Sequence, residues 1–216
     1  SRAPARLVWR LQVTPKALKP IRELVLIDAQ SGAIALHFNQ VPDVKNRITS
    51  NSNNTTTLPG TLVCNESSGD ACSSGANLEA DFAHLYAGHT YDFYFTTHAR
   101  DSLDNAGMTL RSSVNWNDGV SCPNAFWDST QMVYCTGLSR ADDVVAHELT
   151  HGVTERTSNL FYYYQSGAIN ESLSDAWGEF VDQTNGSGTD NATTAWQMGE
   201  DATGLGVIRD MEDPTI

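Results

Sequence analysis

Apolar residues alternate or cluster with the spacing of β-strands in the first forty positions of the chain. The stretches 7–13 (LVWRLQV) and 23–28 (ELVLID) carry this pattern, and DAQSGAIALHFN continues it as a hairpin that turns at Ser31-Gly32. Short apolar runs separated by a glycine-containing turn are typical of antiparallel strands. We therefore predict a small antiparallel sheet at the start of the chain.

The apolar periodicity disappears between residues 41 and 60. Asn, Ser and Thr dominate there, most densely in NSNNTTTLPG at residues 51–60. Such composition is typical of linkers and processing regions. We expect residues 46–60 to be a linker, with a maturation cleavage between Asn39 and Ser50.

Helical spacing of apolar residues begins further along the chain. Residues 78–99 predict a long helix whose buried side carries several large apolar and aromatic residues, Phe82, Leu85, Tyr86 and Phe93. Met108 to Val114 then predicts a strand. A second helix should run from about Arg140 to Thr154, with Ser139 as its N-cap and one buried face formed by Val145, Leu149 and Val153.

A third helix is predicted from Ala168 to Val181. Its apolar residues fall on one side, which we expect to be buried: Ile169, Leu173, Ala176, Phe180 and Val181. Its opposite side carries Glu171, Asp175, Gly178 and Asp182. We expect that line of carboxylates to face the second helix.

The second helix contains the pentapeptide HELTH at residues 147–151. Residues four apart project from one helix face, so His147 and His151 can bind one metal ion while Glu148 stands beside them. A catalytic zinc takes three protein ligands and keeps an open position, and Glu171 is the candidate third ligand. Asp175, one turn further on, can accept the free ring N–H of a zinc-bound histidine. The alternative, two surface histidines on an ordinary helix, is disfavoured by this correctly spaced NExxxD segment.

Composition narrows the class of protein. A chain of 216 residues with 40% hydrophobic residues can bury a core, and a net charge of −13 disfavours nucleic acid and anionic membranes as partners. There is no apolar run of 18 residues that could span a membrane.

The four cysteines occur as two local pairs, Cys64 with Cys72 and Cys122 with Cys135. Two disulfides and an oxidising compartment are favoured over free buried thiols, although the pairing stays open.

Taken together, these segments resemble the thermolysin-type neutral metallopeptidases. The similarity rests on HELTH, on a glutamate twenty residues after the second histidine, and on further segments in the family's order: AHLYAGHTYDFY, LRSSV, PNAFWDSTQMVY, GAINESLSDAWGE and WQMGED. It extends roughly from Leu58 to Pro214. The resemblance implies an α+β fold, with an N-terminal catalytic domain over residues 61–216 made of an antiparallel sheet and long helices. Residues 1–45 would then be the C-terminal part of a propeptide domain of the PepSY type, with the alternative that they are the first strands of the enzyme.

The same resemblance implies zinc endopeptidase chemistry on proteins and peptides. His147, His151 and Glu171 would hold the zinc, Glu148 would act as general base and then acid, and Tyr162 would stabilise the oxyanion. For Tyr162 the alternative is core packing within LFYYYQ. Asn124 and Ala125 would hold an extended substrate on an edge strand, unless this segment is a plain surface hairpin.

Further residues match the family's substrate pocket and calcium site. Arg209 would bind a substrate carbonyl, and an apolar pocket for the residue after the scissile bond would be lined by Leu138, Val144, Met198 and Ile208, which implies a preference for large apolar side chains. If the two helices run antiparallel, Asp143 meets Asp182, and with Glu200 they would bind Ca²⁺. The alternative is that these are ordinary solvated acidic residues. Ala195 stands where a second calcium would need a carboxylate, so we expect one calcium.

One departure concerns a further catalytic histidine of the family. It lies in a helical C-terminal domain, whereas the last histidine of this chain is His151. We therefore expect a fragment that is truncated before that domain, binds zinc, and is weakly active or inactive as it stands.

We expect the protein to be secreted and monomeric, with peptide substrates and its own propeptide as partners. Two rival functions are a catalytically inactive module whose prosegment occupies the cleft, and an aminopeptidase, which the edge strand disfavours.

Overall fold

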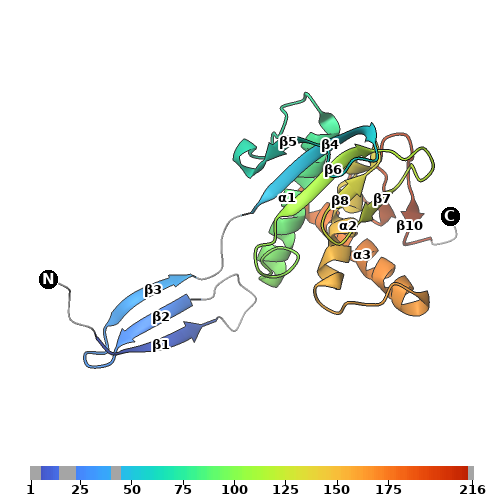
Figure 1. The fold of residues 1–216 in the computed structure, drawn as a ribbon. Helices are drawn as coiled ribbons and strands as arrows, with labels where there is room; N and C mark the ends of the chain where they lie inside the picture. Colours follow the sequence, from blue (N-terminus) through green and yellow to red (C-terminus); the bar gives the residue numbers. More distant parts are fainter. Residues whose placement is uncertain (1–5, 15–22, 40–44, 214–216) are drawn as a thin grey trace.

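The first strands form a small sheet of their own. The computed structural model describes residues 6–14, 23–39 and 45–213. Strands β1 (Val8–Val13), β2 (Glu23–Asp28) and β3 (Ile34–Asn39) pair antiparallel in the order β1-β2-β3. This sheet extends away from the rest of the described chain (Figure 1). The prediction of a small antiparallel sheet is confirmed.

The main body is built on a mixed five-stranded sheet in the order β5-β4-β6-β8-β7. Its strands are β4 (Arg47–Thr55), β5 (Thr61–Asn65), β6 (Leu110–Trp116), β7 (Ala125–Trp127) and β8 (Met132–Tyr134). The central pairs β4–β6 and β6–β8 are parallel, while β5 and β7 are antiparallel to their neighbours. The expectation of an antiparallel sheet is therefore wrong for the central strands, because the long connections between them let each strand return in the same direction. Strand β7 is therefore an edge strand, and the resemblance had placed substrate binding there.

The expectation of a linker over residues 46–60 is wrong for β4, which lies inside this sheet between β5 and β6. Its buried positions are polar, so no apolar periodicity marks them: Arg47, Thr49, Ser50 and Ser52. The buried Arg47 is satisfied by two hydrogen bonds of 2.7 Å to Glu66, an ion pair of 2.8 Å with Asp70, and the carbonyl of His84 at 2.9 Å. Hydrogen-bonded polar side chains can occupy interior positions, and sequence hydropathy alone does not reveal this.

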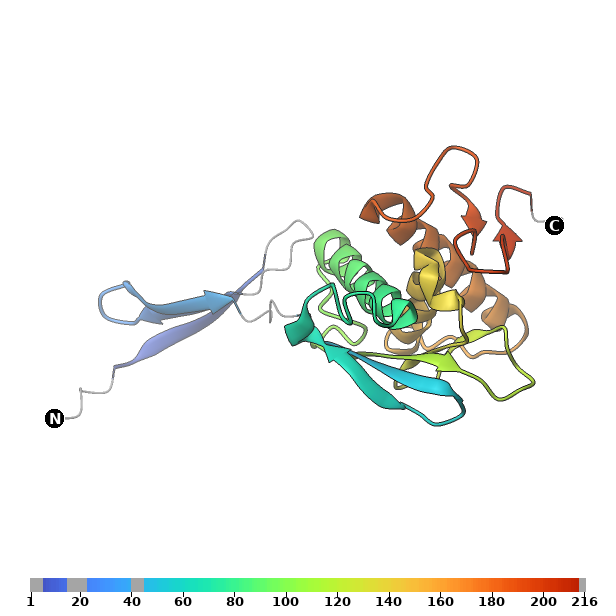
Figure 2. The ribbon, with the colours of Figure 1, turned by 90° about the horizontal axis from the view of Figure 1, so that it is seen from above.

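Three long helices lie on one side of the five-stranded sheet (Figure 2). They are α1 (Leu78–His98), α2 (Asp142–Glu155) and α3 (Tyr164–Asn185), and the short elements are η1 (Glu66–Ser68), η2 (Leu138–Arg140), β9 (Gln197–Met198) and β10 (Arg209–Asp210). A continuous apolar core joins α1, α2 and the sheet through Tyr86, Leu110, Met132 and Leu149. In the part of the chain that is described, no helix is both long enough and apolar enough to cross a membrane.

Helix α2 begins two residues later than predicted, and Ser139 does not cap it. Its N-cap residue is Ala141, while Ser139 belongs to η2. The Ser139 hydroxyl donates to the buried carboxylate of Glu79 at 2.6 Å, and Arg140 donates to the same group at 2.6 Å. The Ser139 hydroxyl therefore connects η2 to α1 and is not available to cap α2. The prediction of Ser139 as the N-cap is wrong.

The predicted buried side of α3 is exposed for most of its length. Ile169 is 52% exposed, Leu173 37% and Phe180 41%, although Val181 is buried as expected. The side packed on α2 carries small and polar residues instead, because the two helices approach closely. A Cβ atom added at Gly178 would lie 2.8 Å from the carbonyl oxygen of Asp143. The side of α3 that carries the carboxylates thus faces α2, as predicted. The reason is close packing of small and polar residues between the two helices, and the apolar residues on the opposite side of α3 are mostly exposed.

Both expected disulfides form. Cys64 is bonded to Cys72 and Cys122 to Cys135. The second bond joins the segment before β7 to the residue after β8, so it braces the edge of the sheet. The local pairing proposed from the sequence is confirmed, and all four cysteines are used.

The buried His84 should make the stability of the fold depend on pH. Burial, together with the charge of Arg47, lowers the pKa of His84 to about 4, and the Thr49 hydroxyl lies 2.9 Å from its Nδ1. An unfolded histidine has a pKa of about 6.5. Stability from the neutral ring is therefore present above about pH 6.5 and is lost as the pH falls toward 4, because the unfolded chain then binds the extra proton. Urea denaturation measures the free energy of unfolding at each pH. Between pH 7 and pH 4, we expect this free energy to decrease by up to about 3 kcal/mol less in the His84→Asn variant than in the wild type. The same decrease in the two proteins would contradict this account.

Candidate active site

A cleft of about 880 Å³ runs between β7, α2 and the segment that leads into α3. It brings together residues that lie far apart in the sequence. Every residue assigned to the substrate from the resemblance lines it: Asn124, Ala125, Leu138, Val144, Met198, Ile208 and Arg209. Leu138, Val144 and Met198 also belong to one buried apolar cluster, so that part of the wall is apolar and fixed.

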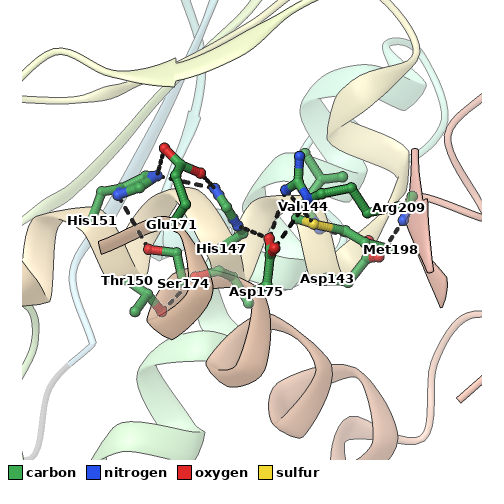
Figure 3. Close-up of polar contacts among 12 residues, drawn as sticks. Asp143, Val144, His147, Thr150, His151, Glu171, Ser174, Asp175, Met198 and Arg209 are labelled. Atoms are coloured by element: carbon green, nitrogen blue, oxygen red, sulfur yellow. Dashed lines mark hydrogen bonds and ion pairs between the residues drawn. The ribbon is translucent and has the colours of Figure 1, made fainter. Parts of the chain in front are cut away.

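Three side chains converge in this cleft from the facing sides of α2 and α3. Nε2 of His147 lies 3.0 Å from Nε2 of His151, and the Glu171 carboxylate oxygens lie 3.2 Å from the first nitrogen and 3.6 Å from the second. Figure 3 shows Glu171 reaching over both rings from α3. The structure therefore brings the three predicted zinc ligands to one point.

This arrangement fits a zinc ion. Zinc binds nitrogen and oxygen ligands at about 2.0–2.2 Å, so ligand atoms at the corners of a tetrahedron are about 3.3 Å apart. The three separations in the cleft, 3.0, 3.2 and 3.6 Å, bracket that value. Two imidazoles and one carboxylate are also the ligand set of a catalytic zinc that keeps its fourth position open.

Oxygen atoms of neighbouring side chains lie within 3.1 Å of the outer ring nitrogens of both histidines, while the inner nitrogens face the metal position. Nδ1 of His147 lies 2.8 Å from Asp175, as expected from the sequence. Nδ1 of His151 lies 2.8 Å from the Asn170 side-chain oxygen and 3.1 Å from the Ser174 hydroxyl. Sequence reasoning missed Asn170 and Ser174, and the available signal was their spacing of one helical turn beside Glu171. Such outer contacts fix the tautomer of a metal-binding histidine.

The pKa values of the two histidines are shifted in opposite directions. Burial alone would lower the pKa of His147, but the contacts with Asp175 and Glu171 outweigh it and raise this pKa to about 9. Burial and the charge on His147 lower the pKa of His151. Two imidazoles that face one point repel each other if both are protonated. A metal ion can take the place of the protons, because neutral imidazoles bind it through their ring nitrogens.

Glu148 lines the cleft beside His147 and is only 8% exposed. Burial raises the pKa of Glu148 to about 7, while the charge on His147 acts in the opposite direction. A carboxyl whose pKa is close to neutral pH can both accept and return a proton, which is what a general base that later acts as an acid requires.

Tyr162 also faces the cleft. Its side chain is 63% exposed, and its ring centre lies 6.0 Å from that of His151. This position does not agree with the alternative of core packing. The neighbouring Tyr163 and Tyr164 are exposed as well but do not line the cleft, so Tyr162 is the tyrosine of this run that a substrate can contact.

Arg209 is held by the same carboxylate that orients His147. Its Nε and Nη2 donate to the two oxygens of Asp175 at 3.0 and 2.6 Å. Figure 3 shows Asp175 between the histidine and the guanidinium group. The side chain of Arg209 is still 43% exposed at the cleft wall, so it can contact a substrate while it is fixed by Asp175.

A second acidic group lies where the end of α3 meets the segments before and after β9. Oxygens of Asp182, Asp190 and Glu200 all lie within 4.8 Å of one another. Asp182 and Glu200 were expected to meet, but Asp190 replaces Asp143 in this group. The Asp143 carboxylate instead accepts hydrogen bonds from the backbone amides of Val144 and Gly199. All four carboxylate oxygens of Asp182 and Glu200 are buried without a hydrogen bond, which is costly unless a cation is bound.

Replacement of Asp175 by Asn should weaken zinc binding without abolishing it. The change removes the negative charge that orients and polarises His147, and losses of this kind are about 10- to 100-fold in metal affinity. Competition with a chromophoric chelator measures the effect. The matched control is Arg209→Ala, which breaks the pair with Asp175 but leaves the contact with His147 and should change the affinity little. An unchanged affinity in Asp175→Asn would show that this contact does not support the metal site.

Comparison with known proteins agrees with the geometry of the site. Residues 25–155 match the family described as the catalytic domain of thermolysin metallopeptidases, and residues 158–216 match its alpha-helical domain. In this division α3 belongs with the alpha-helical domain, whereas the sequence analysis had placed residues 61–216 in one catalytic unit.

Individual relatives give the same result. The chain is 41% identical over 178 residues to a bacillolysin of Bacillus cereus, which covers 77% of this chain and 30% of the relative. It is 43% identical over 160 residues to a zinc metalloproteinase of Renibacterium salmoninarum, which covers 68% of this chain and 29% of the relative. The solved precursor of protealysin, a metalloproteinase from Serratia proteamaculans, aligns with a TM-score of 0.60 and 40% identity over 66% of this chain and 45% of that one. The chain thus spans about 30% of the length of these two curated relatives. The matched segments include HELTH and Glu171, and the chain belongs to the thermolysin metallopeptidase family.

Proposed function

We propose that the protein is a secreted zinc endopeptidase that cleaves proteins and peptides. The observation that carries the proposal is the convergence of His147, His151 and Glu171 on one point of a cleft that an edge strand borders. Glu148 lies beside that point. Two disulfides in a small chain are consistent with an oxidising compartment outside the cytoplasm.

The cleft residues have separate tasks in peptide hydrolysis. When bound, zinc supplies a Lewis acid that polarises water and the scissile carbonyl. Glu148 accepts a proton from the attacking water and then donates it to the leaving amine. The hydroxyl of Tyr162 donates a hydrogen bond to the oxyanion that develops on the carbonyl oxygen when water attacks the carbonyl carbon.

The substrate would bind as an added strand. Strand β7 presents an outer edge to the cleft, and an extended peptide can pair with it through backbone hydrogen bonds that depend little on side chains. Asn124 and Ala125 begin this edge, and the amide of Cys135 donates to the Asn124 carbonyl at 2.9 Å, which fixes that end of the strand. Arg209 would bind a substrate carbonyl on the leaving-group side.

Two further parts of the proposal concern segments outside the cleft. We propose that residues 1–45, which include the small sheet, act as part of a propeptide and as a partner of the enzyme. The similarity to the protealysin precursor supports this proposal, whereas the match to the catalytic domain already begins at residue 25. We also propose that Asp182, Asp190 and Glu200 bind one calcium ion, because carboxylate oxygens are the ligands that Ca²⁺ prefers and those of Asp182 and Glu200 are buried without a hydrogen-bond partner.

The side-chain preference of the pocket is tested with peptides that differ only in the residue after the scissile bond. Leu138, Val144 and Met198 are buried and apolar there, with the half-exposed Ile208 at the rim. We expect zinc-dependent cleavage before leucine to exceed cleavage before alanine by roughly 10- to 100-fold in kcat/KM, and cleavage before aspartate to be slower still. Equal rates for the three peptides would contradict the assignment of this pocket.

A further inference from the structure

The cleft ends, beyond His151, at a carboxylate that the proposed chemistry does not use. Glu155 is the last residue of α2 and lines the cleft together with Trp127, Asn159 and Phe161. It follows His151 by four residues, so it projects from nearly the same helix face, about 6 Å further along the axis. The apolar pocket lies toward the other end of α2, at Val144. The metal position therefore separates Glu155 from that pocket.

The Glu155 carboxylate is oriented, but it keeps capacity to accept further hydrogen bonds. The indole Nε1 of Trp127 donates to its Oε2 at 2.6 Å. Nη2 of Arg156 lies 3.9 Å from the other oxygen, which is too long for a hydrogen bond, and the same nitrogen donates to the carbonyl of Ser129 at 2.9 Å. With its side chain 30% exposed, Glu155 can accept from a group that enters the cleft.

The other charged side chains of the cleft wall are matched within the site. Arg209 pairs with Asp175, and Glu171 faces the two histidines. Glu148 lies beside His147 and acts there as the base. Among the described residues of the wall, this leaves Glu155 as the acidic group that a substrate side chain can pair with.

The cleft wall also carries aromatic residues, among them Phe161 and Trp127. Phe161 is exposed and Trp127 is half-buried, and both line the wall with Glu155. A carboxylate beside aromatic faces suits a long cationic side chain, because the aliphatic stem packs on the rings while the charged end reaches the carboxylate.

We propose that Glu155, oriented by Trp127, forms a subsite that selects lysine or arginine at the second residue before the scissile bond. The inference rests on the proposed function, since it requires a peptide in the cleft. Val144 and Glu155 are eleven residues apart on α2, about 16 Å along its axis, whereas two residues of an extended peptide cover about 7 Å. The two side chains must therefore extend away from each other along the cleft, and a long side chain such as lysine or arginine suits the more distant carboxylate. The residue after the bond and the second residue before it are two apart, so both side chains point to the side where α2 lies.

The test measures peptide binding, so it does not depend on turnover. Zinc-loaded protein with Glu148→Gln, which removes the base, is titrated into fluorescein-labelled hexapeptides that carry leucine after the scissile bond. The second residue before the bond is lysine, norleucine or glutamate. We expect fluorescence anisotropy to show that lysine binds about 5- to 20-fold more tightly than norleucine at low salt, and glutamate more weakly than either.

Adding Glu155→Gln should bring the lysine and norleucine peptides to within about twofold of each other. Glutamine can still accept from the indole of Trp127, so the variant removes the charge and keeps the orientation. Glu212→Gln, which removes an exposed charge after β10, is the matched control and should keep the lysine preference.

The possible failures are distinguishable. If Glu155→Gln weakens all three peptides equally, Glu155 has only a structural role and the inference is overturned. Equal binding of the three peptides to the parent protein would also overturn it, while leaving the proposed function intact. If the norleucine peptide does not bind the zinc-loaded protein at all, the proposed function fails and this inference fails with it.

Discussion

The Glu148→Gln variant is expected to bind one zinc ion as tightly as the wild type and to lose peptide hydrolysis by about 10³- to 10⁴-fold in kcat. Glu148 is buried in the cleft beside His147 but is not among the three residues whose atoms converge on the metal position. Glutamine preserves the size and most of the hydrogen bonding of the side chain. It cannot accept a proton from water at neutral pH, so the step that the carboxylate performs is lost while the metal site remains.

Two readouts separate this role from a structural one. Zinc content measured by mass spectrometry should be unchanged, and KM for an apolar peptide should change much less than kcat, because Glu148 acts in the transition state. Glu212→Gln provides a control for the removal of one negative charge. Loss of zinc in Glu148→Gln, or activity within tenfold of the wild type, would contradict the assignment of the base.

Calcium is expected to raise the thermal midpoint of the zinc-loaded protein by on the order of 10 °C. A ligand at about a thousand times its dissociation constant stabilises the folded state by about 4 kcal/mol, and for a chain of this size each kcal/mol shifts the midpoint by about 2–4 °C. The reason lies in Asp182 and Glu200, whose carboxylate oxygens are buried and have no hydrogen-bond partner among the described residues. Differential scanning calorimetry with and without calcium, at a fixed concentration of free zinc, measures the shift.

The effect of calcium should grow with pH. Burial raises the pKa of Glu200 to about 7 and that of Glu179, a buried neighbour on α3, to about 8. Both values exceed the ordinary value of 4.5. In the calcium-free protein the stability that these protonated carboxyls contribute is therefore present below about pH 4.5 and is lost as the pH rises through 7 to 8. Calcium replaces the protons, so the difference between the two midpoints should widen over that range.

Asp182→Asn should abolish most of the calcium-dependent shift, whereas Glu212→Gln should leave it intact. The asparagine variant removes one of the charges that repel each other in the cluster, so it should also be less sensitive to calcium removal than the wild type. A wild-type midpoint that does not respond to calcium at pH 8 would contradict the proposed site.

The sequence predicted the zinc site well because helical spacing is a local rule. His147 and His151 are one turn apart on α2, and Glu171 and Asp175 are one turn apart on α3. Each pair therefore shares a face whatever the tertiary packing. Once the two helices pack, the four side chains have few alternatives, and the structure brings them together as expected.

Predictions based on hydropathy failed where buried residues are polar. Strand β4 carries Arg47 and Thr49 inside the protein, and their partners Glu66 and His84 come from other elements that the local sequence does not specify. The face of α3 was misjudged for a related reason. Close helix contact at Gly178 favours small residues, and this geometric demand outweighs the burial of Ile169 and Phe180.

The acidic cluster shows the limit of reasoning from helix geometry alone. Antiparallel helices predict that Asp143 lies near Asp182, but they do not predict that backbone amides at Val144 and Gly199 bind the Asp143 carboxylate. Asp190 comes from the segment between α3 and β9, whose path no periodic pattern defines. Its place beside Asp182 and Glu200 is visible only in three dimensions.

The zinc content of the purified, folded chain tests the central claim most directly. We predict about one zinc ion per chain for the wild type and a large loss of bound zinc for His147→Ala, with circular dichroism showing that both proteins are folded. The geometry requires this, because the inner nitrogens of the two histidines and the carboxylate of Glu171 meet at one point. A folded wild type that binds no zinc, or zinc binding that His147→Ala does not change, would contradict the account.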